Sequence, residues 1–209
     1  FKLAADDWRT NLAFAKKLFA ERDFDNILPI GERFANQSPA IALLYARALV
    51  HTNQAAEAVG FLKNYTLLPF EGANEARAVY HEACIRAALA GFAGKDYKTA
   101  AAFAEAALDW PRNLGVGRPY DVDERMDYYL LYKCMQKLGR KKAATEYQDL
   151  LIQHPSENTP ALIFQALALK DKGENALGQT LLDLAAQKPG QDWIQSWYRG
   201  KGNLPKQAV

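Results

Sequence analysis

The residue combinations that most often mark a catalytic or metal site are incomplete in this chain. His81 and Glu82 begin like the helix of a zinc protease, but that motif needs a second histidine four residues after the first, where Ile85 stands. There is no Gly-x-Ser-x-Gly sequence for a nucleophilic serine, and neither cysteine has the spaced histidine and asparagine of a cysteine protease. We therefore expect no enzyme activity, no metal site and no cofactor.

The neighbouring carboxylates are explained by helix starts. Asp6 with Asp7 and Asp121 with Asp123 are the acidic pairs, and Asp121 is followed three residues later by Glu124 in a capping-box arrangement. Carboxylates are favoured at the amino-terminal end of a helix because the helix dipole is positive there. These pairs predict where helices begin and give no sign of acid–base catalysis.

Composition limits the classes of partner. The chain has 26 Lys and Arg against 24 Asp and Glu, an excess too small to attract nucleic acid or an anionic membrane by charge alone. No apolar stretch reaches the roughly 18 residues of a membrane-spanning helix. Cys84 and Cys134 lie in apolar helical patterns and are expected to be buried thiols, which suits a reducing compartment such as the cytoplasm. Phe1 in place of Met indicates a processed or excised chain, so the compartment stays open.

The remaining candidate site residues are expected to lie on helices or in the loops between them. The chain repeats one spacing between a turn residue and a proline, which is typical of helical units. A polar turn residue is followed sixteen residues later by proline in five places: Asp23 to Pro39, Asn53 to Pro69, Lys95 to Pro111, Gly139 to Pro155 and Gly173 to Pro189. Each interval carries small or apolar residues at helical spacing, and a second such pattern precedes each turn. Ser38 with Pro39 and Thr159 with Pro160 are expected helix starts. Each unit is predicted to be helix, turn, helix.

Two segments carry a resemblance to a known family. Lys95 to Pro111, and Leu138-Gly139-Arg140 with Ala143 and Ala144, resemble the tetratricopeptide repeat (TPR). The resemblance extends from about Trp8 to Pro189, although Ile27 and Gly178 stand where a small alanine is usual. It implies an all-α fold, a right-handed α-α superhelix of about five helix pairs with a short C-terminal capping helix. The expected single domain 1–209 has units at about 8–39, 40–69, 70–111, 112–155 and 156–189, and a cap at 190–200.

Two units are longer than the rest. Successive prolines are separated by 30, 42, 44 and 34 residues, against a TPR period of about 34. The surplus must precede the turn, in 70–74 with a lengthened first helix and in 112–120. Insertions of this kind often emerge on the binding face of a helical repeat. Arg112, Asn113, Arg118 and Tyr120 are therefore candidate contacts in the second insertion, and an ordered connecting loop is the alternative.

The run from Trp110 to Tyr120 carries a second resemblance. It is similar to a linker in TPR arrays of large bacterial proteins whose amino-terminal part is a β-sandwich of the sugar-mutarotase type. That resemblance implies that the chain is the carboxy-terminal helical part of such a protein, in a carbohydrate-related context. Gly115 and Gly117 within this run permit positive φ or a close backbone approach.

The expected function is that of a protein-interaction module. In TPR arrays the first helices line the concave groove, and carrying that register across places Lys16, Arg47, Tyr129 and Lys133 in the groove. We expect them to contact a peptide or protein segment of acidic and apolar character, or only to cover the groove as solvated charges. The alternatives are an intramolecular scaffold for a missing amino-terminal domain, and self-association through the aromatic stripe of Trp193, Ile194, Trp197 and Tyr198.

Overall fold

Segments with small or apolar residues every three or four positions form helices throughout the part of the chain that the structure describes. The structure is a computed structural model and describes residues 6–68, 74–155 and 159–187. In these ranges the regular elements are α-helices and short 3-10 helices, without a strand, so the prediction of an all-α fold is confirmed. The chain divides into two compact units, residues 1–120 and 121–209, and each is described by itself. A single continuous domain stays a prediction.

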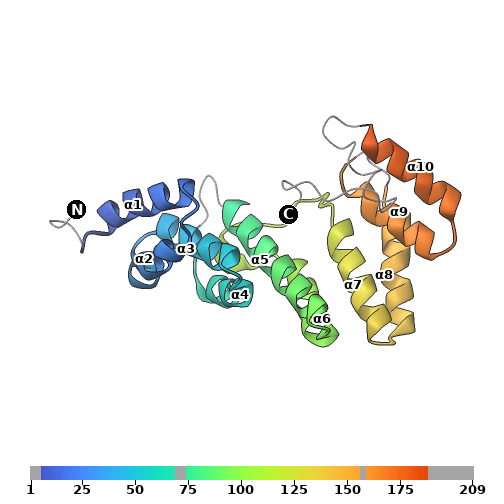
Figure 1. The fold of residues 1–209 in the computed structure, drawn as a ribbon, viewed down its shortest axis with the longest axis horizontal. Helices are drawn as coiled ribbons and strands as arrows, with labels where there is room; N and C mark the ends of the chain where they lie inside the picture. Colours follow the sequence, from blue (N-terminus) through green and yellow to red (C-terminus); the bar gives the residue numbers. More distant parts are fainter. Residues whose placement is uncertain (1–5, 69–73, 156–158, 188–209) are drawn as a thin grey trace. The chain divides into compact units, whose positions relative to one another are not determined.

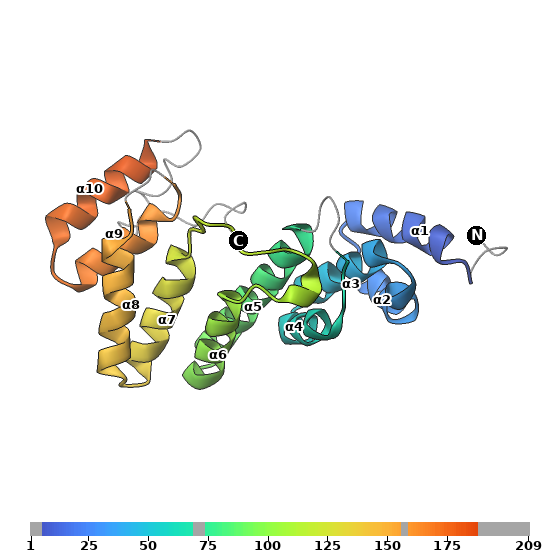
Figure 2. The same cartoon turned by 180° about the vertical axis from the view of Figure 1, so that it is seen from behind.

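Consecutive helices pack as pairs (Figures 1 and 2). The first unit contains α1 (Trp8–Ala20), α2 (Leu28–Phe34), α3 (Pro39–His51), α4 (Ala55–Asn64), α5 (Asn74–Ala93) and α6 (Tyr97–Ala107). It also has three short 3-10 helices, η1 (Asp25–Ile27), η2 (Ala35–Gln37) and η3 (Arg112–Leu114). The second unit contains α7 (Arg125–Lys137), α8 (Lys141–Gln153), α9 (Leu162–Asp171) and α10 (Asn175–Ala186). In the first unit, α3 lies between α1 and α5 and contacts both.

The predicted turns end the first helix of each pair in one way. A residue with positive φ follows the helix, and the next residue donates its N–H to the carbonyl five positions back, which is the Schellman arrangement. The residues with positive φ are Arg22, Asn53, Lys95, Gly139 and Gly173. The matching hydrogen bonds are Asp23 to Leu18, Gln54 to Leu49, Asp96 to Gly91, Arg140 to Met135 and Glu174 to Leu169. The recurrence confirms helix–turn–helix units at these positions.

Small residues bring the paired helices close together. A Cβ on Gly178 of α10 would lie 2.9 Å from the carbonyl oxygen of Ala166 in α9. A Cβ on Gly91 of α5 would lie 3.1 Å from the backbone nitrogen of Ala100 in α6. Gly178 departs from the usual alanine because the backbones approach so closely that no side chain fits there.

The first pair departs from the prediction. Its residue with positive φ is Arg22 rather than Asp23, and a continuous helix between Asp23 and Pro39 is wrong. Instead the chain forms η1, the seven-residue helix α2 and η2. Pro29 stands in the first turn of α2, where its missing N–H costs nothing. Because proline has no N–H to donate to an earlier carbonyl, the preceding helical turn cannot continue through Pro29, and a new helix begins instead.

The predicted helix starts are correct at some positions and wrong at others. Asp7 caps α1 by accepting from the backbone N–H groups of Arg9 and Thr10, each at 3.3 Å. The start of α3 at Pro39 is also confirmed. The capping box of Asp121 with Glu124 is wrong, because α7 begins only at Arg125.

Thr159 and Pro160 precede the helix start rather than marking it. The two residues form a turn in which the N–H of Leu162 donates to the carbonyl of Thr159 at 3.1 Å, and α9 begins at Leu162. The sequence therefore places this start about two residues too early.

The remaining structural expectations concern thiols, insertions and termini. Cys84 and Cys134 are buried free thiols as predicted, and burial raises the pKa of each to about 11. The lengthened first helix of the third unit is α5, with 20 residues. No helix in the described ranges has the length and apolarity needed to cross a bilayer. The expected cap at 190–200 and the aromatic stripe lie outside the described residues.

Candidate functional site

A pocket of about 650 Å³ lies in the first unit along α1 and α3. The two helices contact each other, and the start of α5 completes one side. The lining residues are Trp8, Leu12 and Lys16 from α1, Ser38, Pro39, Ala40, Leu43, Leu44 and Arg47 from α3 and its cap, and Glu75 from α5. The structure therefore brings two predicted groove residues, Lys16 and Arg47, to one pocket.

The wall of this pocket changes in character along the helices. Trp8 and Leu12 line it from the amino-terminal half of α1, and Lys16 follows one turn after Leu12. Along α3, Leu43 and Leu44 precede Arg47 in the same direction. Since residues four apart lie on one helix face, each helix presents apolar side chains first and a cation next.

Arg47 is held by contacts from two other helices. Its Nη2 lies 2.8 Å from Oε1 of Glu75 at the start of α5, and its guanidinium lies 5.6 Å from the ring centre of Phe19 in α1. Lys16 is an exposed side chain. The guanidinium is thus oriented before any partner arrives, with its Nη2 paired to Glu75.

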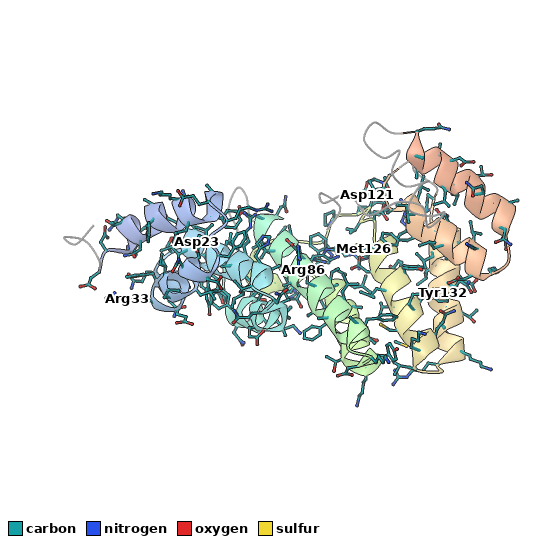
Figure 3. The ribbon with its side chains drawn as sticks, viewed as in Figure 1. Asp23, Arg33, Arg86, Asp121, Met126 and Tyr132 are labelled. Atoms are coloured by element: carbon teal, nitrogen blue, oxygen red, sulfur yellow. The ribbon has the colours of Figure 1, made fainter. Side chains whose placement is uncertain are left out.

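Two further cations, Arg22 and Arg86, lie near His51 at the carboxyl end of α3. The imidazole of His51 stacks on Phe24 with ring centres 4.2 Å apart. Burial lowers the pKa of His51, and Arg86, Arg22 and Arg47 lower it further, whereas Glu82 raises it. Arg86 projects from α5 (Figure 3).

The helix register used in the sequence analysis did not predict Arg22 or Arg86 as site residues. Arg22 lies in the turn after α1, and Arg86 lies on α5 at a position outside the transferred register. Packing of α1, α3 and α5 brings both near His51, so only the tertiary structure assembles this cationic end.

In the second unit the predicted groove residues Tyr129 and Lys133 contact each other on α7. Lys133 Nζ lies 5.8 Å from the ring centre of Tyr129 and 5.5 Å from that of Tyr132. The same ammonium group donates to Asp171 Oδ2 of α9 at 3.0 Å. Burial raises the pKa of Tyr129 to about 12. Lys133 is thus already paired within the second unit.

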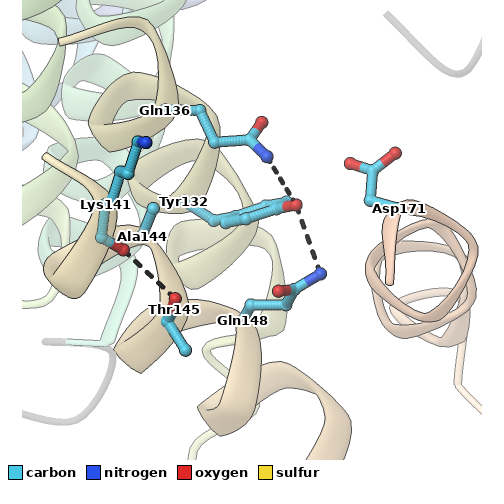
Figure 4. Close-up of a pocket in the computed structure, with 7 residues that line it drawn as sticks. All are labelled: Tyr132, Gln136, Lys141, Ala144, Thr145, Gln148 and Asp171. Carbon is cyan, nitrogen blue, oxygen red and sulfur yellow. Dashed lines mark hydrogen bonds between the residues drawn. The ribbon is translucent and has the colours of Figure 1, made fainter. Parts of the chain in front are cut away.

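A second pocket, of about 500 Å³, lies beside these residues (Figure 4). The hydroxyl of Tyr132 accepts from Gln136 Nε2 at 2.6 Å and from Gln148 Nε2 at 3.2 Å. Gln148 also donates to the carbonyl of Ala168 at 3.0 Å. Burial, with the charge of Asp171, raises the pKa of Tyr132 to about 12. The polar side chains of this wall bond one another and offer hydrogen bonding, without an activated nucleophile.

The second insertion is fastened to the end of α4. Asn113 Nδ2 donates to the carbonyl oxygens of Leu62 at 2.9 Å and Tyr65 at 2.7 Å, and the backbone N–H of Leu67 donates to the carbonyl of Asn113 at 2.7 Å. These bonds satisfy carbonyls that the last turn of a helix leaves without an internal partner. Asn113 therefore acts within the first unit.

The other candidates in this insertion are solvent-facing. Arg112, Arg118 and Tyr120 are exposed, and Tyr120 is completely so. They do not line either of the two pockets described above. A role for them in binding a partner stays a prediction.

The two glycines of this insertion should differ in their tolerance of alanine. Gly115 has φ of +73°, and a Cβ there would lie 2.9 Å from the carbonyl oxygen of Leu67, whereas a Cβ on Gly117 meets nothing within 4 Å. Gly115→Ala should lower the free energy of unfolding by about 1 to 3 kcal/mol, and Gly117→Ala should change it by less than about 0.5 kcal/mol. Thermal melts of both variants test this, and equal effects would contradict the assignment.

A polar network around a buried arginine in the second unit was also missed. Arg125 is completely buried, and its Nε and Nη2 donate to Oδ1 and Oδ2 of Asp123 at 2.8 and 2.7 Å. Nη2 donates to Thr159 Oγ1 at 2.7 Å and Nη1 to Gln165 Oε1 at 3.3 Å. The hydrogen bonds from Arg125 are the main cause that lowers the pKa of Asp123 to about 2, although burial opposes it. A buried arginine at the start of α7 has no signature in local sequence.

This network ties together segments that precede α7 and α9. Gln165 donates from Nε2 to the carbonyls of Ile152 and His154, at 3.1 and 3.0 Å, which adds the end of α8. Every polar atom named here has a protein partner, so the arrangement is structural. In the described part of the chain no group of three or more His, Cys, Asp or Glu is placed to hold a metal ion.

Comparison of the chain with known proteins adds no relative. No protein-family model, no curated protein and no solved structure matches it. The functional conclusion therefore depends on the residues and geometry of the two units.

Proposed function

We propose that this chain is a TPR-like interaction module, a right-handed superhelix of about five helix pairs that binds a polypeptide segment and catalyses no reaction. The pocket along α1 and α3 carries this proposal. Its volume of about 650 Å³ is within the range of sites that take compact ligands or a few side chains. An apolar wall with a small number of charges at one end suits a peptide better than a free metabolite, which would need converging polar groups.

The energetics of such a site follow from its lining. Trp8, Leu12 and Leu44 are partly buried and would lose their remaining contact with water beneath a bound side chain. Burial of apolar surface contributes roughly 25 cal/mol per Å², so one large anchor supplies most of the affinity. Lys16 and Arg47 would then fix the direction of the segment through charge.

The direct test is selection of random displayed peptides on the full 209-residue chain. Peptides that bind should lose about 3- to 10-fold in affinity on Lys16→Glu, because this exposed side chain lines the pocket and the substitution reverses its charge. Lys17→Glu is the matched control, since Lys17 is the exposed neighbour on α1 and does not line the pocket.

Each outcome of the selection bears on the proposal. Affinity that falls for Lys16→Glu and is kept for Lys17→Glu supports the groove in the first unit. Equal affinity for both variants places binding elsewhere on the chain and overturns this assignment. Failure to select any peptide, with a chain that melts cooperatively, argues against a peptide-binding module altogether.

A further inference from the structure

We propose that Glu75 binds Arg47 at the same position where a carboxylate of the bound segment binds it. The groove would then select a segment with an apolar anchor and acidic residues at a fixed separation, and Glu75 would compete with those residues for Arg47. This inference rests on the proposed function and names the chemistry of the partner at the same site.

The order of the lining residues sets the separation between anchor and acid. Trp8 and Lys16 are eight residues apart on α1, which corresponds to about 12 Å along the helix axis at a rise of about 1.5 Å per residue. An extended segment advances roughly 3.3 Å per residue. Its acidic residue should therefore follow or precede its apolar anchor by about three to four positions.

Charge complementarity identifies the occupant as acidic. Among the described residues that line the pocket, the cations are Lys16 from α1 and Arg47 from α3. The carboxylate in the same set is that of Glu75, which lies 2.8 Å from Arg47. Two cations against one carboxylate give the described lining of the pocket a net positive charge beside its apolar wall.

Glu75 is suited to displacement. Its side chain is 47% exposed and that of Arg47 is 33% exposed, so water reaches both partners of the pair. An ion pair of this kind adds little to stability, because water screens it and both side chains lose freedom in forming it. An acidic residue tethered to a seated apolar anchor has a high effective concentration at Arg47 and can replace Glu75 there.

The experiment compares two labelled synthetic peptides by fluorescence anisotropy on the full chain. Both carry a leucine anchor, and one has two glutamates about three to four positions away where the other has two glutamines. We expect the wild-type chain to bind the glutamate peptide more tightly. Glu75→Gln should tighten binding of that peptide by about 2- to 5-fold and leave the glutamine peptide unchanged.

Two further variants separate competition from a change in folding. In an Arg47→Gln background, Glu75→Gln should no longer tighten binding, because the cation for which the two carboxylates compete is gone. Glu57→Gln is the matched control: Glu57 lies in the first turn of α4, as Glu75 does in α5, but it does not line the pocket. It should change neither affinity.

The possible failures are distinguishable. If both peptides bind equally and Glu75→Gln changes nothing, the acidic selectivity is overturned while a peptide-binding groove stands. The same holds if displayed peptides bind at Lys16 but neither synthetic peptide binds. If no peptide of any composition binds the chain, the proposed function itself is overturned. Tighter binding by Glu75→Gln that persists without Arg47 would refute competition.

Discussion

Replacement of Asp123 by alanine is expected to lower the free energy of unfolding of the second unit by about 3 to 5 kcal/mol. Asp123 supplies both carboxylate oxygens to the guanidinium of Arg125, which is completely buried at the start of α7. Without that partner the buried guanidinium keeps the neutral acceptor of Gln165 and the hydroxyl of Thr159, but it loses the carboxylate to which Nε and Nη2 donate. Burial of a charge without its counterion carries a large desolvation cost.

Hydrogen exchange and chemical denaturation measure this loss. Amide protons of α7 and α9 should exchange faster in Asp123→Ala, because the network joins the segments that precede both helices. Asp121→Ala is the control, since Asp121 lies two residues earlier in the same exposed segment, whereas Arg125 donates to Asp123. Equal effects of the two substitutions would show that the Asp123 carboxylate contributes nothing beyond general surface charge.

The same pair gives a pH dependence with a definite sign. The folded state holds the pKa of Asp123 at about 2, below its ordinary value of about 3.8. A depressed carboxyl pKa adds stability that is complete above the unfolded value and is lost as pH falls through the folded value. The stability difference between the wild type and Asp123→Asn should therefore be constant above about pH 5 and shrink between about pH 4 and pH 2.

Gly31→Ala should destabilise the first unit by about 2 to 3 kcal/mol. A Cβ on Gly31 of α2 would lie 2.1 Å from Cδ2 and 2.5 Å from Cβ of Tyr45 in α3. Tyr45 cannot yield by rotating its ring tip alone, because its own Cβ is in the way. Accommodation would require α2 to move away from α3, with loss of contacts in the core that contains Ile30 and Phe34.

Gly60→Ala provides the comparison with opposite sign. Gly60 lies inside α4, is exposed, and a Cβ there meets nothing within 4 Å. Alanine should raise the free energy of unfolding by about 0.5 to 1 kcal/mol, because glycine loses more backbone entropy on entering a helix. Thermal and urea unfolding of the two variants should move in opposite directions. A neutral or stabilising Gly31→Ala would mean that α2 is not packed on α3 as the structure has it.

Local chemistry made several features readable from the sequence. Apolar spacing predicted the helices, and the turn residues Asn53, Lys95, Gly139 and Gly173 mark the left-handed ends of four first helices. These features depend on residues within one or two helical turns of one another, so composition and spacing carry the information. The first pair is the exception, because Pro29 restarts the helix within the expected interval.

The candidate site was predictable only in part. Helix register identified Lys16 and Arg47, and both line the pocket along α1 and α3. Register could not show that Glu75 lies on Arg47, since the two residues come from different helix pairs. Nor could it show that Asn113 would cap α4 across about 50 residues of sequence.

The sequence by itself determined an all-helical chain of repeated helix–turn–helix units, because period and turn chemistry are local properties. The tertiary structure alone decided which polar side chains are paired with other residues of the same unit. It paired the buried Arg125 with Asp123, Lys133 with Asp171, and Arg47 with Glu75. The physical reason is that burial and ion pairing depend on which helix faces pack together, and the spacing of residues along the chain does not specify that packing.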